Sequence, residues 1–361
     1  MYSYLKPLLF LLDPETAHDS VKMVSRFFPP ALLKSVACYK STRLNAKIGK
    51  VSLENPIGLA AGFDKNAEMI PFMSALGFGF LEIGSITAYP SPGNPKPRLF
   101  RLPQDQSIIN RLGLPNKGVT HVAKQLNSFR SPSPLGINLA QTPQLAFEDG
   151  KRPGTGIDDY LETFAKLHTK GAYVVFNLSC PNTEEGTTFE HPSQFEPLAK
   201  AIAGTRKSLG VTKPLLIKLS PDMEKKHLSK TVDMALKYGF DGFVVSNTTP
   251  SRPKLKTSSR EIQKIGKGGL SGQALTSLAN AQLKNVYDIV GQDKILMGVG
   301  GLMSFEDLLA KMAAGASFFQ IYTGLIYGGP FFVKMLLVKL DQLCQKLKVR
   351  SYQELVGVVD L

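Results

Sequence analysis

From about residue 45 onward, short apolar segments alternate with longer amphipathic segments along the chain. The short segments are rich in β-branched and aromatic residues, which is typical of buried strands. Eight of them are expected to be strands: Ile57–Ala60, Phe80–Gly84, Leu135–Asn138, Tyr173–Leu178, Leu215–Leu219, Gly242–Ser246, Ile295–Val299 and Phe318–Tyr322. Seven intervening segments have apolar residues at helical spacing: Ala67–Leu76, Gly118–Phe129, Asp158–His168, Gln194–Leu209, Glu224–Tyr238, Leu275–Val290 and Phe305–Ala314.

Eight strands that alternate with helices over roughly 250 to 300 residues are typical of one α/β fold, the (β/α)₈ TIM barrel. A doubly wound open sheet would offer fewer units and a glycine fingerprint after its first strand. The run Gly298-Val299-Gly300-Gly301 lacks the third glycine of that fingerprint. We therefore expect residues 45–361 to form one barrel domain. Long insertions at residues 89–111, 183–196 and 249–268 are expected to be loops that form lids or entry channels.

The first 44 residues differ from the barrel region. Leucines within residues 5–12 share one helical face, a second amphipathic segment covers residues 16–28, and a third covers residues 31–39. The longest apolar run, Leu8 to Leu12, is far shorter than the roughly 20 residues of a spanning helix, and it lacks a secretory cleavage site. Short amphipathic helices joined by prolines suit a segment that lies on a bilayer, and they equally suit a helical hairpin that caps the barrel. Either way, residues 1–44 are predicted to be a helical extension.

The net charge of +14 is unusual, and the lysines and arginines are spread along the whole chain. This distribution argues against nucleic acid as a partner and predicts a generally basic surface. Such a surface attracts anionic lipid or acidic metabolites, or it serves solubility alone. Three scattered cysteines and five histidines without metal-ligand spacing predict a reducing compartment and no bound metal.

Polar residues and glycines gather where the expected strands end. The fourth strand runs into Asn177-Leu178-Ser179-Cys180-Pro181-Asn182, which places a thiol between two amides. An isolated cysteine is more often buried and structural, so the other strand ends decide the interpretation. They carry Asp64, Lys65, Asn66, Ser85, Asn138, Lys218, Ser246, Asn247, Thr248, Thr249, Gly300, Gly301, Tyr322, Thr323 and Gly324. Because the carboxyl ends of barrel strands share one face, these residues are expected to form one site.

The residue types at this face indicate the kind of ligand. Glycines at Gly268–Gly272, Gly300–Gly301 and Gly324 suit a phosphate, which barrels often bind after their last two strands. Lys65 and Lys218 suit an electron-rich ring or its reduced anion. Amide side chains that both donate and accept suit a planar substrate with amide and carboxylate groups: Asn110, Asn177, Asn182 and Asn247. Together these features predict an FMN oxidoreductase.

A set of motifs extends over nearly the whole chain: Asn55-Pro56, Gly58–Gly62, Asp64-Lys65, Glu82–Gly84, Pro97–Leu102, Asn110-Arg111, Gly136–Asn138, Ser179, Pro181–Thr183, Asn247–Thr249, Gly268–Gly272, Gly298–Gly301 and Gln320–Tyr322. With these motifs the sequence closely resembles dihydroorotate dehydrogenase, in particular its membrane-associated, quinone-reducing class. The resemblance implies FMN-dependent oxidation of (S)-dihydroorotate to orotate in de novo pyrimidine (UMP) biosynthesis, with electrons passed to a membrane quinone. It also implies a peripheral membrane protein on the cytoplasmic face of the inner or cell membrane.

The resemblance further implies a role for individual residues. The implied FMN contacts are Ala61, Gly62, Lys65, Ser85, Asn138, Asn177, Lys218, Ser246, Gly272, Gly301, Tyr322 and Thr323. The residues implied to surround dihydroorotate are Lys65, Asn110, Arg111, Leu112, Gly113, Leu114, Asn182, Asn247 and Thr248. His18, Arg101 and the N-terminal helices would form the quinone tunnel. Cys180 stands at the position of the base, which removes the C5 proton while C6 delivers hydride to flavin N5.

The chain departs from the family pattern at three places. The membrane class has a serine as the base, whereas the soluble class has a cysteine at this position. This chain has a cysteine, Cys180. A thiol with a pKa of about 8.5 ionises far more easily than an alcohol, so it needs less help from its surroundings. Ala140-Gln141-Thr142 replaces a Gly-Lys-Asn sequence, and Glu184-Glu185-Gly186-Thr187 replaces a Pro-Gly-Leu-Arg sequence. The last two changes affect the lid and the substrate edge, whereas the expected flavin site is largely intact.

Three other functions are weighed against this one. An FMN barrel of the same family would use a soluble acceptor or an altered substrate. A flavin-free barrel lyase or aldolase would use Lys65 or Lys218 as a Schiff-base amine. A membrane-surface protein without activity would require a degraded flavin site, and the glycines at the phosphate end argue against it. Colour separates the flavin hypotheses from the lyase, because a protein with bound FMN is yellow.

Overall fold

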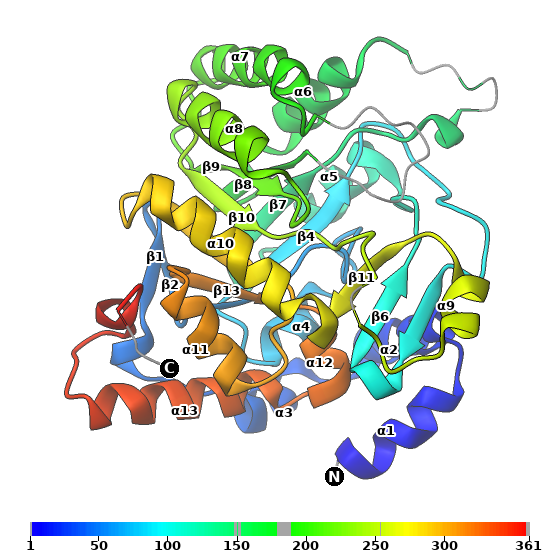
Figure 1. Ribbon diagram of the computed structural model, residues 1–361, viewed down its shortest axis with the longest axis vertical. Helices are drawn as coiled ribbons and strands as arrows, with labels where there is room; N and C mark the ends of the chain where they lie inside the picture. Colours follow the sequence, from blue (N-terminus) through cyan, green and yellow to red (C-terminus); the bar gives the residue numbers. More distant parts are fainter. Residues whose placement is uncertain (1, 148–149, 151–152, 179–188, 253, 359–361) are drawn as a thin grey trace.

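The computed structural model describes residues 2–147, 150, 153–178, 189–252 and 254–358. Eight parallel strands close into a barrel, with helices around it (Figure 1). The barrel strands are β3 (Ile57–Leu59), β4 (Phe80–Ile86), β7 (Leu135–Leu139), β8 (Tyr173–Asn177), β9 (Leu215–Leu219), β10 (Gly242–Val245), β12 (Ile295–Val299) and β13 (Phe318–Ile321). They succeed one another around the barrel in chain order, and β13 closes it against β3. The eight predicted strands and the TIM barrel are therefore confirmed.

Helices between the strands form the outer layer of the molecule (Figure 1). Those that correspond to predicted helices are α4 (Ile70–Ala75), α5 (Gly118–Asn127), α6 (Gly156–Leu167), α7 (Pro192–Ser208), α8 (Lys225–Lys237), α10 (Thr276–Val290) and α11 (Phe305–Ala313). Two further helices, α12 (Thr323–Gly328) and α13 (Phe332–Lys346), follow the last strand and were not predicted. Single 3₁₀ turns are η1 (Thr42–Leu44), η2 (Pro103–Asp105), η3 (Gln144–Ala146), η4 (Gln273–Leu275) and η5 (Tyr352–Leu355).

The barrel strands are buried on both faces, which explains why their sequences are almost continuously apolar. Every residue of β4, β7, β8, β9 and β10 is buried. Between strand and helix the packing is aromatic: the ring of Phe176 on β8 lies 5.3 Å from that of Phe164 on α6 and 6.0 Å from that of Phe240. The same strands also bury the polar side chains of Glu82, Ser85, Asn138, Asn177 and Lys218, so the barrel is not purely apolar.

Two of the insertions expected to be loops contain or adjoin regular structure. Residues 89–111 contain β5 (Leu99–Leu102) and β6 (Ser107–Asn110), and residues 249–268 contain α9 (Ser259–Ile265) and lead into β11 (Gly269–Gly272). The three strands form an antiparallel sheet in the order β11-β6-β5, and a separate hairpin of β1 (Ala46–Ile48) and β2 (Val51–Leu53) precedes the barrel. The sheet has its own apolar cluster: Leu102, Ile109, Ile265 and Leu270. The expectation of simple loops was wrong here, because the sheet pairs segments about 160 residues apart.

The N-terminal extension consists of α1 (Tyr2–Leu11), α2 (Pro14–Phe27) and α3 (Pro30–Ala37), which confirms its three predicted helical segments. Asp13 caps α2, because its side chain accepts hydrogen bonds from the backbone of the first turn. Contacts to the rest of the chain include the Tyr2 hydroxyl, which donates to the Ile326 carbonyl at 2.5 Å, and an ion pair between Glu15 and Arg98 at 3.0 Å. Within the described residues, no helix combines the length and the apolar character that crossing a bilayer requires.

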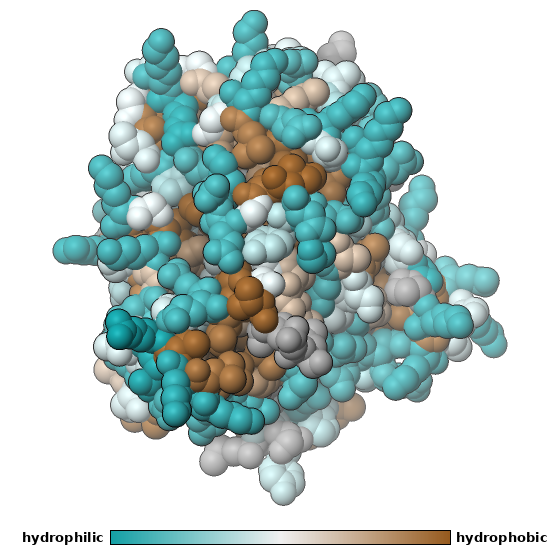
Figure 2. All heavy atoms as spheres, turned by 60° about the vertical axis from the view of Figure 1, so that its left-hand side comes forward, coloured by the Kyte–Doolittle hydropathy of each residue, from teal (hydrophilic) through white to brown (hydrophobic). Residues whose placement is uncertain are grey.

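Hydrophilic side chains cover most of the face shown in Figure 2, with separate hydrophobic patches between them. This agrees with a sequence in which lysine and arginine are spread along the whole chain. Most of the exposed large apolar side chains among the described residues belong to the three N-terminal helices or lie next to them: Tyr4, Leu5, Leu8, Leu11, Leu12, Met23, Val24, Phe27, Phe28, Leu32 and Val36. The extension therefore differs in surface character from the remainder of the molecule.

Candidate active site

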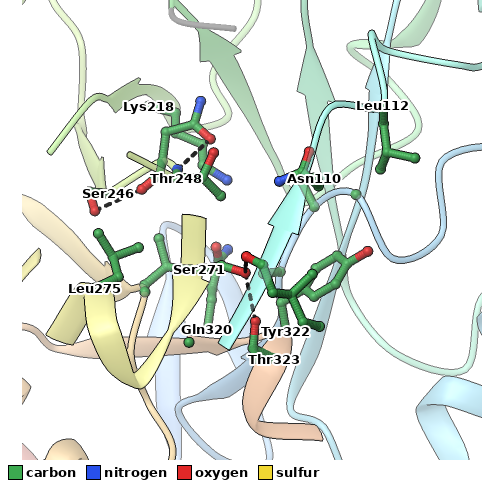
Figure 3. A pocket seen from close by; sticks show the side chains of 18 of the residues that line it. Asn110, Leu112, Lys218, Ser246, Thr248, Ser271, Leu275, Gln320, Tyr322 and Thr323 are labelled. Atoms are coloured by element: carbon green, nitrogen blue, oxygen red, sulfur yellow. Dashed lines mark hydrogen bonds between the residues drawn. The ribbon is translucent and has the colours of Figure 1, made fainter. Parts of the chain in front are cut away.

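A cavity lies at the carboxyl ends of the barrel strands, and residues of β5, β6 and β11 line one part of it. It encloses about 1090 Å³ of empty space, including the part that is open to solvent. Figure 3 shows Lys218 and Thr248 on one side of this cavity and Asn110 on the other, with Tyr322 and Thr323 toward the bottom of the view.

All but one of the residues predicted to contact the cofactor line this cavity: Ala61, Gly62, Lys65, Ser85, Asn177, Lys218, Ser246, Gly272, Gly301, Tyr322 and Thr323. The exception is Asn138, which is fully buried behind the wall. Its amide nitrogen donates to Glu82 Oε1 at 2.8 Å, and its amide oxygen accepts from the Ser85 hydroxyl at 2.5 Å. Asn138 therefore supports a residue of the wall instead of facing the cavity itself.

Most residues predicted around the substrate also line the cavity: Lys65, Asn110, Leu112, Gly113, Leu114, Asn247 and Thr248. Arg111 does not. Its guanidinium donates to the carbonyls of Pro97 and Ile265 and lies 5.0 Å from the Phe100 ring, so it ties neighbouring segments together. Cys180 and Asn182 lie outside the described residues, and their roles stay predictions.

Two lysines give the cavity positive charge: Lys218 is buried, and Lys65 is partly buried. Loss of hydration, followed by the charge of nearby Arg98, lowers the pKa of Lys65 to about 8. Burial also lowers the pKa of Lys218, although the neighbouring Glu82 acts in the opposite direction. Reduced access to water at both ammonium groups favours a ligand that supplies negative charge or electron density.

Glycines let backbone approach the cavity where a side chain would not fit. Gly301 has φ +72°, and a Cβ atom there would lie 2.3 Å from Thr276 Oγ1. Gly272 has φ +97°, and a Cβ atom there would lie 2.4 Å from the Gln106 carbonyl oxygen. Both are conformations that L side chains rarely adopt. Beside them the hydroxyls of Ser271 and Thr323 lie 2.9 Å apart, so this end of the cavity offers backbone and hydroxyl groups to an anion such as phosphate.

A chain of side-chain hydrogen bonds joins neighbouring strands at the cavity wall. The Asn177 amide nitrogen donates to Ser85 Oγ at 3.2 Å, and the Asn247 amide nitrogen donates to Asn177 Oδ1 at 3.2 Å. The end of β8 is fixed from the outside, because the Tyr160 hydroxyl donates to the Asn177 carbonyl at 2.5 Å. The amides therefore have defined directions before any ligand binds.

The two residues predicted for the quinone tunnel lie apart from the main cavity. His18 lines a second cavity, which shares five lining residues with the first: Lys65, Leu99, Leu112, Pro115 and Tyr322. Burial, followed by the charge of Lys65, lowers the pKa of His18 to about 4, so its imidazole is neutral at neutral pH. Arg101 donates to the Leu12 carbonyl at 2.7 Å and lies 4.7 Å from the Phe10 ring, which holds the end of α1.

Several residues that line the cavity were not predicted: Leu99, Ile108, Leu275, Met303 and Gln320. Leu99 and Ile108 belong to β5 and β6, whose two short apolar runs around a four-residue connection are a hairpin signal. Gln320 stands inside an apolar strand, and an isolated amide in such a strand is a signal for an inward-facing polar group. Leu275 and Met303 have no comparable signal in the sequence.

Thr142 belongs to the sequence that stands in place of the family's Gly-Lys-Asn, and it has a structural role of its own. Thr142 is fully buried and its hydroxyl donates to Asp159 of α6 at 2.9 Å, while its backbone N–H binds the same carboxylate. Asp159 also accepts from the Ala88 N–H at 2.9 Å. Thr142 thus joins the segments that follow β4 and β7 to α6. The replaced Pro-Gly-Leu-Arg sequence lies outside the described residues.

Comparison with known proteins decides the family. The family model described as dihydroorotate dehydrogenase matches residues 43–344. The chain belongs to the dihydroorotate dehydrogenase family. It is 37% identical over 362 residues to the dihydroorotate dehydrogenase (quinone) of Gloeobacter violaceus, covering 99% of this chain and 98% of that protein. It is 35% identical to the dihydroorotate dehydrogenase (quinone) of Nocardia farcinica over 99% of this chain and 96% of that protein.

The fold comparison agrees with this membership. The crystal structure of the Eimeria tenella dihydroorotate dehydrogenase in complex with ferulenol has a TM-score of 0.84 and 30% sequence identity to this chain. The match covers 96% of this chain and 95% of that one, so it includes N-terminal helices as well as the barrel. The similarity therefore extends over nearly the whole length of the dihydroorotate dehydrogenase fold.

Proposed function

We propose that this protein oxidises (S)-dihydroorotate to orotate with FMN, in pyrimidine biosynthesis, and passes the electrons to a membrane quinone. The observation that supports this most strongly is the cavity at the strand ends, where two lysines, an amide chain and a glycine-lined anion end meet. The protein belongs to the dihydroorotate dehydrogenase family, and the relatives quoted above carry the name of the quinone enzyme.

The residues of the cavity fit FMN. Gly272 and Gly301 line the end of the cavity where backbone groups would meet a phosphate, and Thr323 adds a hydroxyl. Lys218 places a positive charge deep in the cavity, where it would face the electron-rich part of the ring. Gln320 Oε1 is buried and has no hydrogen-bond partner among the described residues, so it is available to a ring N–H. When bound, FMN would supply a two-electron acceptor.

The substrate would occupy the part of the cavity between β6 and β10. Asn110 and Leu112 line it from the segment of β6, and Asn247 and Thr248 line it from the end of β10. The asparagine amides would bind the carbonyl and N–H groups of the ring, and the Lys65 ammonium would balance the substrate carboxylate. Asn182 would add a further amide from the segment after β8.

Cys180 would act as the base. It follows Asn177, which lines the cavity, by three residues in the chain. Its thiolate would take the proton from C5 of dihydroorotate, and a thiol reaches that ionised state near neutral pH far more readily than a serine hydroxyl does.

Residues 1–44 would carry the protein to its electron acceptor. The apolar side chains exposed on α1 and α2 suit a membrane surface, and the positive net charge suits anionic lipid. Quinone would reach the flavin from this side, past His18 and Arg101. The protein would accordingly be a peripheral membrane protein on the cytoplasmic side.

A second proposal keeps FMN and dihydroorotate but uses a soluble acceptor. The observation in its favour is Cys180, because cysteine at the base position is typical of the soluble class. Similarity over nearly the whole length to a quinone enzyme argues for the first proposal, since this chain and the Gloeobacter violaceus dihydroorotate dehydrogenase (quinone) match over 99% and 98% of their lengths.

Anaerobic mixing with dihydroorotate tests the function directly. The purified protein is expected to be yellow, to lose its visible flavin absorption within seconds of mixing, and to regain it when a quinone is added. Bleaching that is reversed by a soluble acceptor but not by quinone would favour the second proposal. A yellow protein that stays oxidised would refute the substrate, and a colourless protein that FMN cannot reconstitute would refute the flavin.

A further inference from the structure

Glu82 is a fully buried carboxylate on β4 that the proposed chemistry does not use. Three donors surround it. The Asn138 amide nitrogen binds Oε1 at 2.8 Å, whereas the Gln320 amide nitrogen at 2.6 Å and the Tyr173 hydroxyl at 3.1 Å bind Oε2. Lys218, which lines the cavity, supplies a positive charge nearby. All three donors are themselves buried.

An ionised carboxylate can only accept hydrogen bonds, so it forces a direction on its neighbours. Asn138 must turn its NH₂ group toward Glu82 and its oxygen toward Ser85, and the Ser85 hydroxyl must therefore donate at 2.5 Å. Ser85 Oγ can then accept from Asn177, whose oxygen in turn accepts from Asn247. At each hydrogen bond of this chain, which runs from the barrel interior to the cavity wall, the donor and the acceptor are therefore determined by the bond before it.

A second branch of this network reaches the cavity in a single step. Because Gln320 gives its NH₂ group to Glu82, its Oε1 atom is left as a buried acceptor without a partner among the described residues. Gln320 lines the same cavity, as Figure 3 shows. One carboxylate thus sets the direction of amides on both β7 and β13.

Stability alone does not explain a charge at this position. Taking a carboxylate out of water is unfavourable, and apolar residues of similar volume are often neutral or stabilising in its place. Every residue of the strands that surround Glu82 is buried, and most of these residues are apolar. A group that only accepts hydrogen bonds forces its neighbours to donate, and an apolar residue in its place could not fix the direction of the network in this way.

We propose that Glu82 is a positioning residue for the flavin: it fixes which atoms of the Ser85–Asn177–Asn247 chain and of Gln320 present acceptors and which present donors to the ring. This inference rests on the proposed FMN function. Glu82 itself does not line the cavity, so its effect passes through Asn138, Ser85 and Gln320.

Glu82→Gln is the direct test, because it keeps the shape of the side chain but adds two protons. One neighbour must then reverse its amide or face a donor with a donor. We expect the dissociation constant for FMN, measured by quenching of flavin fluorescence in the flavin-stripped full chain, to rise about tenfold to a hundredfold. The visible spectrum and midpoint potential of the residual bound flavin should also shift, because hydrogen bonds to its ring change.

Two further variants separate positioning from packing. Tyr173→Phe removes a donor from the same carboxylate but leaves the amide chain intact, so it should lower the melting temperature while changing FMN affinity less than about twofold. The double variant Glu82→Gln with Asn138→Asp restores the original direction of the hydrogen bonds to Ser85 and Gln320. The carboxylate at position 138 then accepts from Ser85 as before, and the amide at position 82 donates to it while accepting from Gln320 and Tyr173. This exchange should recover most of the lost affinity.

Three outcomes would overturn the inference: wild-type affinity and potential in Glu82→Gln, an equal loss of affinity in Tyr173→Phe, or no recovery in a folded double exchange. If Glu82→Gln does not fold, recovery of folding and FMN affinity in the double exchange supports the inference, and its absence contradicts it. Failure of the proposed function is a different result, because the wild-type protein itself would then bind no FMN.

Discussion

Cys180 is the residue on which the proposed chemistry depends most. Replacing it with alanine removes the only thiol in the strand-end segment, while the residues that line the cofactor part of the cavity stay in place. We expect Cys180→Ala to keep FMN but to slow flavin reduction by dihydroorotate by about a hundredfold to ten thousandfold, the range for loss of a positioned base. Cys180→Ser should retain substantial activity with its pH optimum moved upward, because an alcohol ionises less readily than a thiol. Anaerobic stopped-flow absorbance measures both.

Cys38 provides a matched control for these variants. It is half-buried beside α3, its thiol contacts the Ala75 carbonyl at 3.8 Å, and it does not line the cavity. Cys38→Ser should reduce its flavin at the wild-type rate. An unchanged rate in Cys180→Ala would show that the base lies elsewhere.

The cavity residues that could be predicted share one property, which is their place at a strand end. Lys65, Asn177 and Thr323 follow or close apolar runs, and the barrel brings all such ends to one face. Side-chain direction could not be read from the sequence in the same way. Asn138 has the composition of a cavity residue, but its amide is engaged by Glu82 and Ser85, which are more than 50 positions away in the chain.

Among whole elements, α13 is joined to the segment that follows α3 by one carboxylate. Asp341 on α13 accepts from Arg43 Nε at 2.8 Å, from the Ser41 hydroxyl at 2.6 Å and from the Tyr39 hydroxyl at 2.7 Å. Burial alone would raise the pKa of Asp341, but these hydrogen bonds outweigh it and hold the pKa at about 2. The cluster therefore fixes the end of the N-terminal extension to the last long helix.

Asp341→Asn should lower the free energy of unfolding at pH 7 by about 1 to 3 kcal/mol, because it weakens several hydrogen bonds to a charged group. The folded pKa of about 2 lies below the unfolded value of about 4, so this stabilisation is complete above pH 4 and is lost as pH falls through 2. Urea unfolding of the variant and the wild type between pH 7 and pH 2 measures the difference between their free energies of unfolding, which should become smaller as the pH falls. Glu54→Gln, in an exposed pair with Lys40, is the control and should change little. Equal stability of Asp341→Asn and wild type at pH 7 would contradict the argument.

The secondary-structure elements differ in how well their local sequences predict them. Barrel strands such as Ile295–Val299 are continuous apolar runs between turn residues, so local sequence predicts them almost to the residue. The β5-β6-β11 sheet is different, because its strands have four residues each and its pairing joins Asn110 to Gly269. Local patterns do not contain that pairing. Its contribution to the cavity wall follows from tertiary structure alone.

Taken as a whole, the molecule separates an apolar N-terminal surface from a largely hydrophilic body. Tyr4, Leu11 and Phe27 are 83%, 82% and 81% exposed, which is uncommon for side chains of this size. They belong to both α1 and α2, so the surface extends over two helices. By contrast, Leu33, Ala37 and Leu44 of the same region are part of the main hydrophobic core. Deleting residues 1–44 would therefore damage the fold, and surface substitutions are the sharper test.

The double variant Leu11→Ser with Phe27→Ser should weaken cosedimentation with anionic vesicles by about tenfold or more, because two large apolar side chains no longer enter the bilayer surface. Reduction of a long-chain quinone held in those vesicles should slow correspondingly. Flavin reduction by dihydroorotate and reduction of a short, water-soluble quinone should stay at wild-type rates, since neither side chain lines the cavity. Leu347→Ser removes an exposed apolar side chain at the end of α13 and serves as the control. If the double variant binds vesicles as the wild type does, α1 and α2 cap the barrel and the route to the acceptor lies elsewhere.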